Sequence, residues 1–167
     1  RAPIYLPRAN TDPVSSPHAA LAVFSLALRR PLCEEVLVLM LDNQLRGVGL
    51  MSFDAVASFT NNINHAIGLC SSVLDASSLS ICTVEPHLLG RDSDSKYLEM
   101  AQDLCRHAGL NLIDWLVVTR GAVINIRAVS FYGYAGIKNS FDGCDFLFSN
   151  SGMFSGKIYK LNSSRYL

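Results

Sequence analysis

The residues from 78 to 119 most constrain what this 167-residue chain can fold into. Residues 78–83 are apolar and partly β-branched, which is typical of a buried strand, and Glu85-Pro86 ends that strand because proline cannot continue a ladder. A polar loop follows, and apolar side chains then recur at helical spacing until Gly109. Residues 110–119 are apolar again. The stretch therefore predicts a strand, a loop, an amphipathic helix and a second strand.

The residues on either side predict further helices and strands. Residues 15–30 predict an apolar helix that begins at a Ser-Ser-Pro cap, and residues 34–42 are a near-continuous apolar run that indicates a strand covered on both faces. A return strand is expected over 45–53 and a helix over 54–74, with Asn62 and His65 on its open face. Residues 123–129 alternate as in an edge strand. The predicted fold class is α/β, with a mixed sheet of five or more strands flanked by helices.

The composition indicates one well-packed domain. Half of the residues are apolar and 17% are charged, which excludes a disordered chain. No apolar run is long enough to span a bilayer, so no membrane contact is expected. We expect an extended lead-in over 1–14, an α/β domain over 15–130 and an aromatic, glycine-rich extension over 131–167. The start at Arg1 suggests a fragment of a longer chain.

Five cysteines are scattered along the chain without a Cys-x-x-Cys pair. The number of cysteines is odd, and most of them lie at predicted core positions. This pattern predicts reduced thiols and a cytoplasmic location. No Gly-x-Ser-x-Gly elbow occurs, and no cysteine lies at an evident helix start, so the sequence gives no sign of a nucleophile.

The order of elements and several residues resemble a known family. The order of elements is similar to that of the RadC branch of the JAB/MPN (JAMM) metalloprotease-like domains. It consists of a strand, a proline-containing loop, a serine, a helix ending in Ala-Gly and the strand NLIDWLVV. The likeness extends over about residues 15–130 and implies a JAB/MPN-like, cytidine-deaminase-like layering. A glutamate before the first strand is also a feature of that family, and Glu35 is the matched residue. From the residues alone, Glu34 and Glu35 are expected to be solvated at the strand entry rather than to act as general bases.

The zinc-binding residues of that family are largely replaced here. Aligning the family's His-x-His-Pro loop on Pro86 places its histidines on Thr83 and Glu85, whereas an ungapped count back from Asp114-Trp115 places them on Ile81 and Thr83. The second register places the family's aspartate ligand on Asp94. One carboxylate without two imidazoles cannot hold a catalytic zinc, which needs about three protein ligands. We therefore expect no metal, no cofactor and no catalysis.

A different ligand set in the same loop is an alternative hypothesis. Glu85, His87, Asp92 and Asp94 lie in or beside the loop and together offer one imidazole and three carboxylates, which is adequate for a divalent ion. Ser95 is one of two serines able to cap the following helix. This alternative predicts a metal-dependent hydrolase, although a polar loop of this kind is usually only solvated.

The last residues suggest a second alternative, nucleic-acid binding. Residues 131–167 hold most of the chain's Phe and Tyr residues, interleaved with basic residues. Such residues would suit stacking on the bases of single-stranded nucleic acid and pairing with its phosphates. The candidates are Lys138, Lys157, Tyr159 and Lys160. The simpler interpretation, that these aromatics pack on the domain or on a second copy, is favoured. Because relatives that lack the metal commonly serve as scaffolds or binding partners, the resemblance implies a non-catalytic interaction or scaffold module with a protein partner or a second copy of itself.

Overall fold

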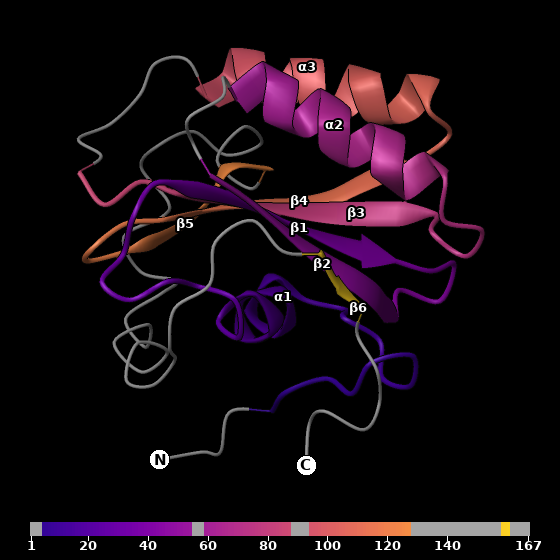
Figure 1. Cartoon of the computed structure of the whole chain (residues 1–167), viewed down its shortest axis with the longest axis horizontal. Coiled ribbons are helices and arrows are strands. Elements are labelled where there is room, and N and C mark those ends of the chain that lie inside the picture. The colour runs from indigo at the N-terminus through magenta and orange to yellow at the C-terminus, as the bar shows by residue number, and fades with distance from the viewer. Residues whose placement is uncertain (1–4, 55–58, 88–93, 128–157, 161–167) are drawn as a thin grey trace.

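The fold is a mixed β-sheet with helices packed on both faces (Figure 1). The computed structural model describes residues 5–54, 59–87, 94–127 and 158–160. The helices are α1 (Pro17–Phe24), α2 (Phe59–Ser71) and α3 (Asp94–His107). The strands are β1 (Glu35–Leu41), β2 (Gly47–Asp54), β3 (Ser78–Val84), β4 (Asn111–Val118), β5 (Val123–Asn125) and β6 (Ile158–Lys160). The predicted α/β class with a mixed, helix-flanked sheet is confirmed.

The strand order sets which chain segments meet at each end of the sheet. Among the described residues the order is β5-β4-β3-β1-β2-β6, with β1 antiparallel to both β2 and β3. β3 and β4 are parallel and are joined through α3, so the stretch from 78 to 119 forms the predicted strand–helix–strand unit. β2, β3 and β4 therefore end at the same side of the sheet, where β1 begins.

β1 is the centre of the core. Every residue of this strand is buried, which confirms the expectation of a strand covered on both faces. Leu37, Leu39 and Leu41 belong to the apolar cluster that also contains α1. Val36 and Val38 belong to the cluster beneath α2 and α3. The alternation along one apolar strand thus builds two cores, one on each face of the sheet.

α1 is shorter than the predicted helix over 15–30. Its start agrees with the sequence, because the Ser16 side chain accepts a hydrogen bond from the Ala19 amide at 3.1 Å and Pro17 follows. The helix ends at Phe24, and the Ser25 hydroxyl donates back to the Ala22 carbonyl at 2.6 Å. The chain then continues in tight turns and carries Arg29 toward the start of β1.

α3 ends as the sequence predicts. Gly109 has a φ of +72°, and the Leu110 amide reaches back to the Cys105 carbonyl at 2.9 Å. A left-handed residue after the last turn closes the helix, and glycine adopts this conformation without strain. The second helix was expected over 54–74, and the described helix α2 is Phe59–Ser71. Residues 55–58 lie outside the described residues.

β5 is an edge strand of the described sheet but is shorter than the expected 123–129. The Arg127 amide donates to the Asn125 side-chain oxygen at 3.1 Å, which turns the chain away from the ladder. Asparagine side chains commonly bond the backbone two residues on and so replace strand pairing. Alternation of apolar residues alone did not reveal this turn.

Both ends of the chain contact the start of β2. In the lead-in, the Asn10 amide donates to the Gly47 carbonyl at 3.0 Å and the Val14 amide to the Leu45 carbonyl at 2.7 Å. In the extension, β6 pairs with residues 49–51 of β2. The boundaries at 14 and 130 stay predictions.

Replacing Leu39 with alanine tests the central position of β1. Leu39 is fully buried (0% exposed), so Leu39→Ala should lower the free energy of unfolding by about 2–5 kcal/mol through lost apolar contact and a residual cavity. Leu26→Ala is the matched control, because Leu26 is 44% exposed. Urea titration followed by circular dichroism measures both changes. Equal losses in the two variants would contradict the central role of β1.

Candidate functional site

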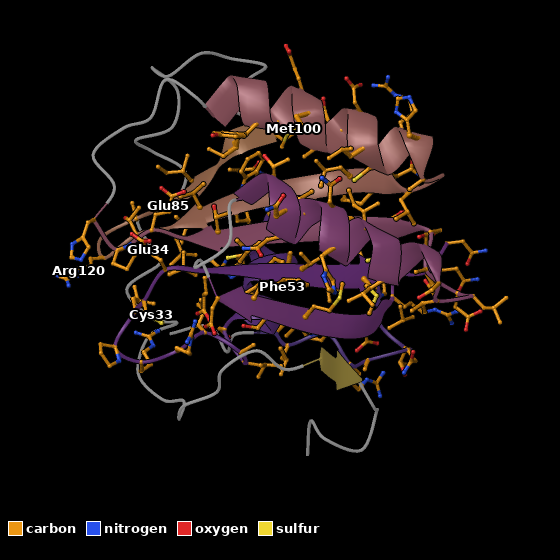
Figure 2. All side chains as sticks on the ribbon, turned by 45° about the horizontal axis from the view of Figure 1, so that its top comes forward. Cys33, Glu34, Phe53, Glu85, Met100 and Arg120 are labelled. Carbon is orange, nitrogen blue, oxygen red and sulfur yellow. The ribbon has the colours of Figure 1, made fainter. Side chains whose placement is uncertain are left out.

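Charged side chains gather where β2, β3 and β4 end and β1 begins, and we name this side the carboxyl edge of the sheet (Figure 2). Glu35 lies opposite both Asp54 of β2 and Val84 of β3, and Val84 lies opposite Val118 of β4. In open α/β sheets, ligands commonly bind outside the carboxyl ends of the strands. A functional site is therefore expected at the carboxyl edge.

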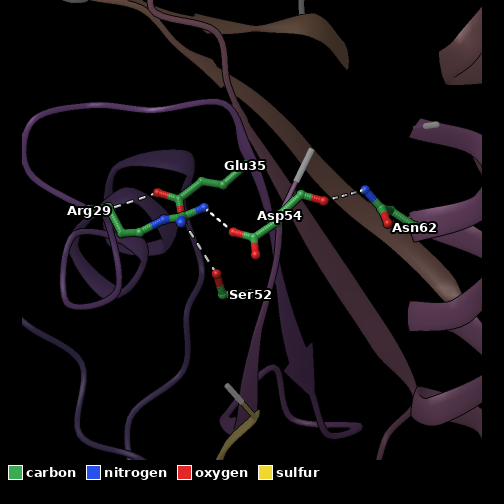
Figure 3. A network of polar contacts seen from close by, with 5 residues as sticks. All are labelled: Arg29, Glu35, Ser52, Asp54 and Asn62. Atoms are coloured by element: carbon green, nitrogen blue, oxygen red, sulfur yellow. Dashed lines mark hydrogen bonds and ion pairs between the residues drawn. The ribbon is translucent and has the colours of Figure 1, made fainter. Parts of the chain in front are cut away.

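Glu35 is a buried carboxylate at this edge. It is 1% exposed, and the expectation that it is solvated is wrong, whereas Glu34 is exposed as expected. The Arg29 amide donates to Glu35 Oε1 at 3.1 Å, and Arg29 Nε donates to Oε2 at 2.9 Å (Figure 3). The Ser52 hydroxyl approaches Oε2 at 3.4 Å. A carboxylate can remain buried and charged only with such partners.

Arg29 joins two carboxylates. Besides Glu35, its Nη2 lies 2.5 Å from Asp54 Oδ1 at the end of β2. Burial lowers the pKa of Arg29, but the hydrogen bonds and charges of Glu35 and Asp54 outweigh this effect, so its pKa is raised. Arg29 is therefore a permanent cation held between β1 and β2.

Asp54 also connects this cluster to the other face of the sheet. The Asn62 side-chain amide of α2 donates to the Asp54 carbonyl at 3.3 Å (Figure 3). Asn62 is buried, so its predicted place on the open face of the helix is wrong. A signal was present, because Asn62 precedes the buried Ala66 by one helical turn. For Arg29 and Ser52, by contrast, no sequence pattern indicates a contact with Glu35.

The matched loop residue Thr83 is part of the core. It is buried on the face of the sheet toward α2 and α3, where the Trp115 indole Nε1 donates to its hydroxyl oxygen at 3.1 Å. Ile81, the other candidate histidine position, is fully buried in the same cluster. Both positions therefore hold side chains that complete internal packing.

Glu35 and Thr83 do not share a pocket, although their strands are neighbours. Glu35 faces the α1 side, where Arg29 binds it, and Thr83 faces the α2 and α3 side, where Trp115 binds it. Glu85, half-buried, lies one position beyond the Glu35–Val84 pair and so comes next to Glu34, as Figure 2 shows. The structure thus brings Glu34 and Glu85 together and separates Glu35 from the loop.

The remaining loop residues are only partly described. His87 is exposed, and Asp92 lies outside the described residues. Asp94 and Ser95 form the first turn of α3, but their side chains are not described. Among the described residues, no group of three His, Cys, Asp or Glu side chains is placed to hold a metal ion. The hypothesis of a shifted ligand set involving Asp92 and Asp94 remains a prediction.

Asp114 lies in β4 at a bulge, away from the carboxyl edge. The register between β3 and β4 shifts between Leu79 and Ile81, opposite Asp114. The Asn125 side-chain amide donates to Asp114 Oδ1 at 3.3 Å. Burial raises the pKa of the Asp114 carboxyl, and the Asn125 hydrogen bond and the charge of Arg127 oppose that rise. Asp114 therefore has local partners of its own and does not meet Glu85 or His87.

The described cysteines are poor nucleophiles. Cys33, Cys70, Cys82 and Cys105 are free thiols. Burial raises the pKa of Cys70 to about 12 and that of Cys105 to about 11, and it also raises the pKa of Cys82 and of the half-buried Cys33. Because the thiolate is the reactive form, these groups lack the depressed pKa of a catalytic cysteine. Cys144 lies outside the described residues.

The nucleic-acid candidates are placed by their backbone at most. Tyr159 and Lys160 belong to β6, which pairs with β2, and their side chains are not described. Lys138 and Lys157 lie outside the described residues. The nucleic-acid hypothesis remains a prediction.

Comparison of the chain with models of protein families and with curated proteins finds no match. In the part of the chain that the structure describes, no helix combines the length and the apolar character needed to cross a bilayer.

Removing the Glu35 carboxylate tests the buried ion pair. Glu35→Ala should lower the free energy of unfolding by about 3 kcal/mol, because Arg29 loses its buried partner but keeps Asp54. The matched control is Glu34→Ala at the exposed neighbour, with an expected change within about 0.5 kcal/mol. Urea unfolding measures both. Similar effects of the two substitutions would contradict the assigned burial.

Asp114 gives a test by pH. Its raised pKa means that the folded chain binds a proton more tightly than the unfolded chain just above pH 3.8, so the unfolding free energy falls as pH rises through the folded pKa. Asp114→Asn cannot ionise and avoids this loss. The variant should gain stability relative to the wild type between pH 3 and pH 7. Urea unfolding at several pH values measures the difference, with Asp103→Asn on the exposed surface as control. A difference that does not change with pH would contradict the assignment.

Proposed function

We propose that this chain is a non-catalytic interaction module, related to the RadC branch of the JAB/MPN domains. Its carboxyl edge contacts a protein partner or a second copy of the chain. The observation that supports this proposal is that buried polar groups at this edge form hydrogen bonds to other residues of the protein. Glu35 is held by Arg29 and Ser52, and Thr83 is held by Trp115.

The relationship to JAB/MPN domains is supported by element order and by a few residues. The hairpin of β1 and β2, the helix α2 and the unit from β3 to β4 follow one another as in the expected layering. Glu35 and Asp114 occupy the matched positions. The finer assignment to cytidine-deaminase-like layering is part of this proposal.

The chemistry of the edge favours binding over catalysis. A general base must reach a substrate proton within hydrogen-bond distance, and the Glu35 carboxylate is 1% exposed and already accepts from Arg29. A catalytic zinc needs about three protein ligands. Thr83 lies where the family has a zinc-binding histidine and has no imidazole to offer. Positions that serve catalysis in the family therefore serve internal stability here.

The side chains that remain accessible suit a contact surface. Glu34, His87 and Arg120 are exposed, with charges of both signs, and they directly precede β1 or follow the ends of β3 and β4. Figure 2 shows Glu34, Glu85 and Arg120 at the same end. Interfaces commonly combine such a polar rim with buried apolar contacts. A partner with complementary charges is the expected occupant.

Site-specific photocrosslinking tests this surface. A photoreactive amino acid at position 87 or 120 should give one discrete adduct, either with a partner protein or as a dimer of this chain. Position 107 is the matched control, because His107, like His87, is exposed, but it ends α3 at the other end of the sheet. Equal adducts from 87 and 107, or none from 87 and 120, would contradict the proposal.

The same preparation separates the two alternative functions. About one equivalent of zinc or manganese after gel filtration, lost in the Glu85→Ala, His87→Ala double variant, would instead support a metal-dependent hydrolase. Salt-sensitive binding of single-stranded nucleic acid, lost when residues 131–167 are deleted, would support the nucleic-acid function. The interaction module predicts neither result.

A further inference from the structure

A second site lies at the other end of the sheet. The turn between β1 and β2 and the loop between α2 and β3 meet there (Figure 1). Together they line a pocket of about 380 Å³, which also includes Asn10 of the lead-in. This volume is at the lower end of the range for ligand pockets and suits a small molecule.

The pocket is lined by an oriented arginine, Arg46. Asp42 Oδ1 accepts hydrogen bonds from the amides of Gln44 and Arg46, each at 2.9 Å. Asp42 Oδ2 accepts from Arg46 Nε at 2.7 Å. These contacts fix the guanidinium group through its Nε, and among the described residues its two Nη groups have no hydrogen-bond partner. A guanidinium held in this way is prepared to bind a carboxylate through two parallel hydrogen bonds.

The pocket is also lined by a carboxylate. Asp75, in the loop between α2 and β3, lines the pocket and is exposed, and no described residue forms an ion pair with it. Asn43 adds a side-chain amide to the lining, and Val48 and Ala76 add apolar surface. The pocket therefore presents a cationic hydrogen-bond donor, Arg46, and an anionic hydrogen-bond acceptor, Asp75, from two separate chain segments.

The backbone around the pocket is held in an uncommon conformation. Among the described residues, Asn10 and Leu45 are the non-glycine residues with positive φ, at +56° and +60°. Asn10 lines the pocket, and Leu45 directly precedes Arg46. For leucine this conformation is sterically unfavourable and persists only where the surroundings impose it. The position of Arg46 is thus fixed by the turn as well as by Asp42.

We propose that this pocket binds a small zwitterion of the free amino-acid type. The ligand carboxylate pairs with the Nη groups of Arg46, and the ligand ammonium pairs with Asp75. The charges of Asp42 and Arg46 cancel, so Asp75 leaves the pocket with one negative charge. Ligands with a net charge of zero or +1 are therefore favoured, and dicarboxylates and phosphate are disfavoured.

Nuclear magnetic resonance titration of the full chain tests this proposal. Lysine, leucine and glutamate are added separately, and the amide signals of Asn43, Arg46 and Asp75 are followed. We expect saturable shifts with lysine and leucine and weaker ones with glutamate. Acetate and methylammonium, which each carry one of the two charged groups, should bind more weakly than leucine. Glucose should cause no saturable shift, and saturation by glucose alone would overturn the proposal.

Two variants assign the contacts. Arg46→Gln and Asp75→Asn should each weaken lysine binding about tenfold or more, because each removes a charge-assisted hydrogen bond. Asp75→Asn keeps the fold, since Asp75 has no ion pair with a described residue. The control is Arg106→Gln, which removes a charge from an exposed ion pair on α3. The proposal would be overturned if none of the three amino acids caused saturable shifts, or if Asp75→Asn bound lysine as well as the wild type does.

Discussion

The buried contact between Arg29 and Glu35 is the interaction on which the carboxyl edge depends. Removing a carboxylate from water costs several kcal/mol unless its oxygens are paired. Glu35 meets this requirement with the amide and the guanidinium of Arg29. Since Arg29 follows α1 and Glu35 begins β1, the pair fixes how the first helix approaches the sheet. The early end of α1 is part of this arrangement, because the turns after Phe24 bring Arg29 to the strand.

The Arg29–Glu35 pair is connected through Asp54 to residues on both faces of the sheet. Arg29 also binds the Asp54 carboxylate, and Asn62 of α2 binds the Asp54 carbonyl. The last residue of β2 is thus held from the α1 side through its side chain and from the α2 side through its backbone. Groups committed to holding three elements together are poorly suited to proton transfer. This is the physical reason for which we favour a binding function over catalysis at this edge.

Much of the fold could be predicted from the sequence because it depends on local periodicity. The fully apolar β1, the unit from β3 to β4 and the glycine that ends α3 all follow from residues close together in the chain. The burial of Glu35 could not be predicted, because periodicity does not show that the turns after α1 bring Arg29 to it, and its other partner, Ser52, lies on another strand. The end of β5 was missed for a different reason. There a single hydrogen bond from Arg127 to the Asn125 side chain overrides the alternation of apolar residues.

The contacts of both chain ends with β2 have a consequence for how the protein avoids association through its sheet. Asn10 engages Gly47, and β6 engages residues 49–51, so two segments far apart in sequence occupy consecutive parts of the same strand. An outer strand with unpaired amides and carbonyls is a template for uncontrolled aggregation. Here the shielding is divided between the beginning and the end of the chain. Shortening the protein from either side would uncover part of that template, even if the central layers stayed intact.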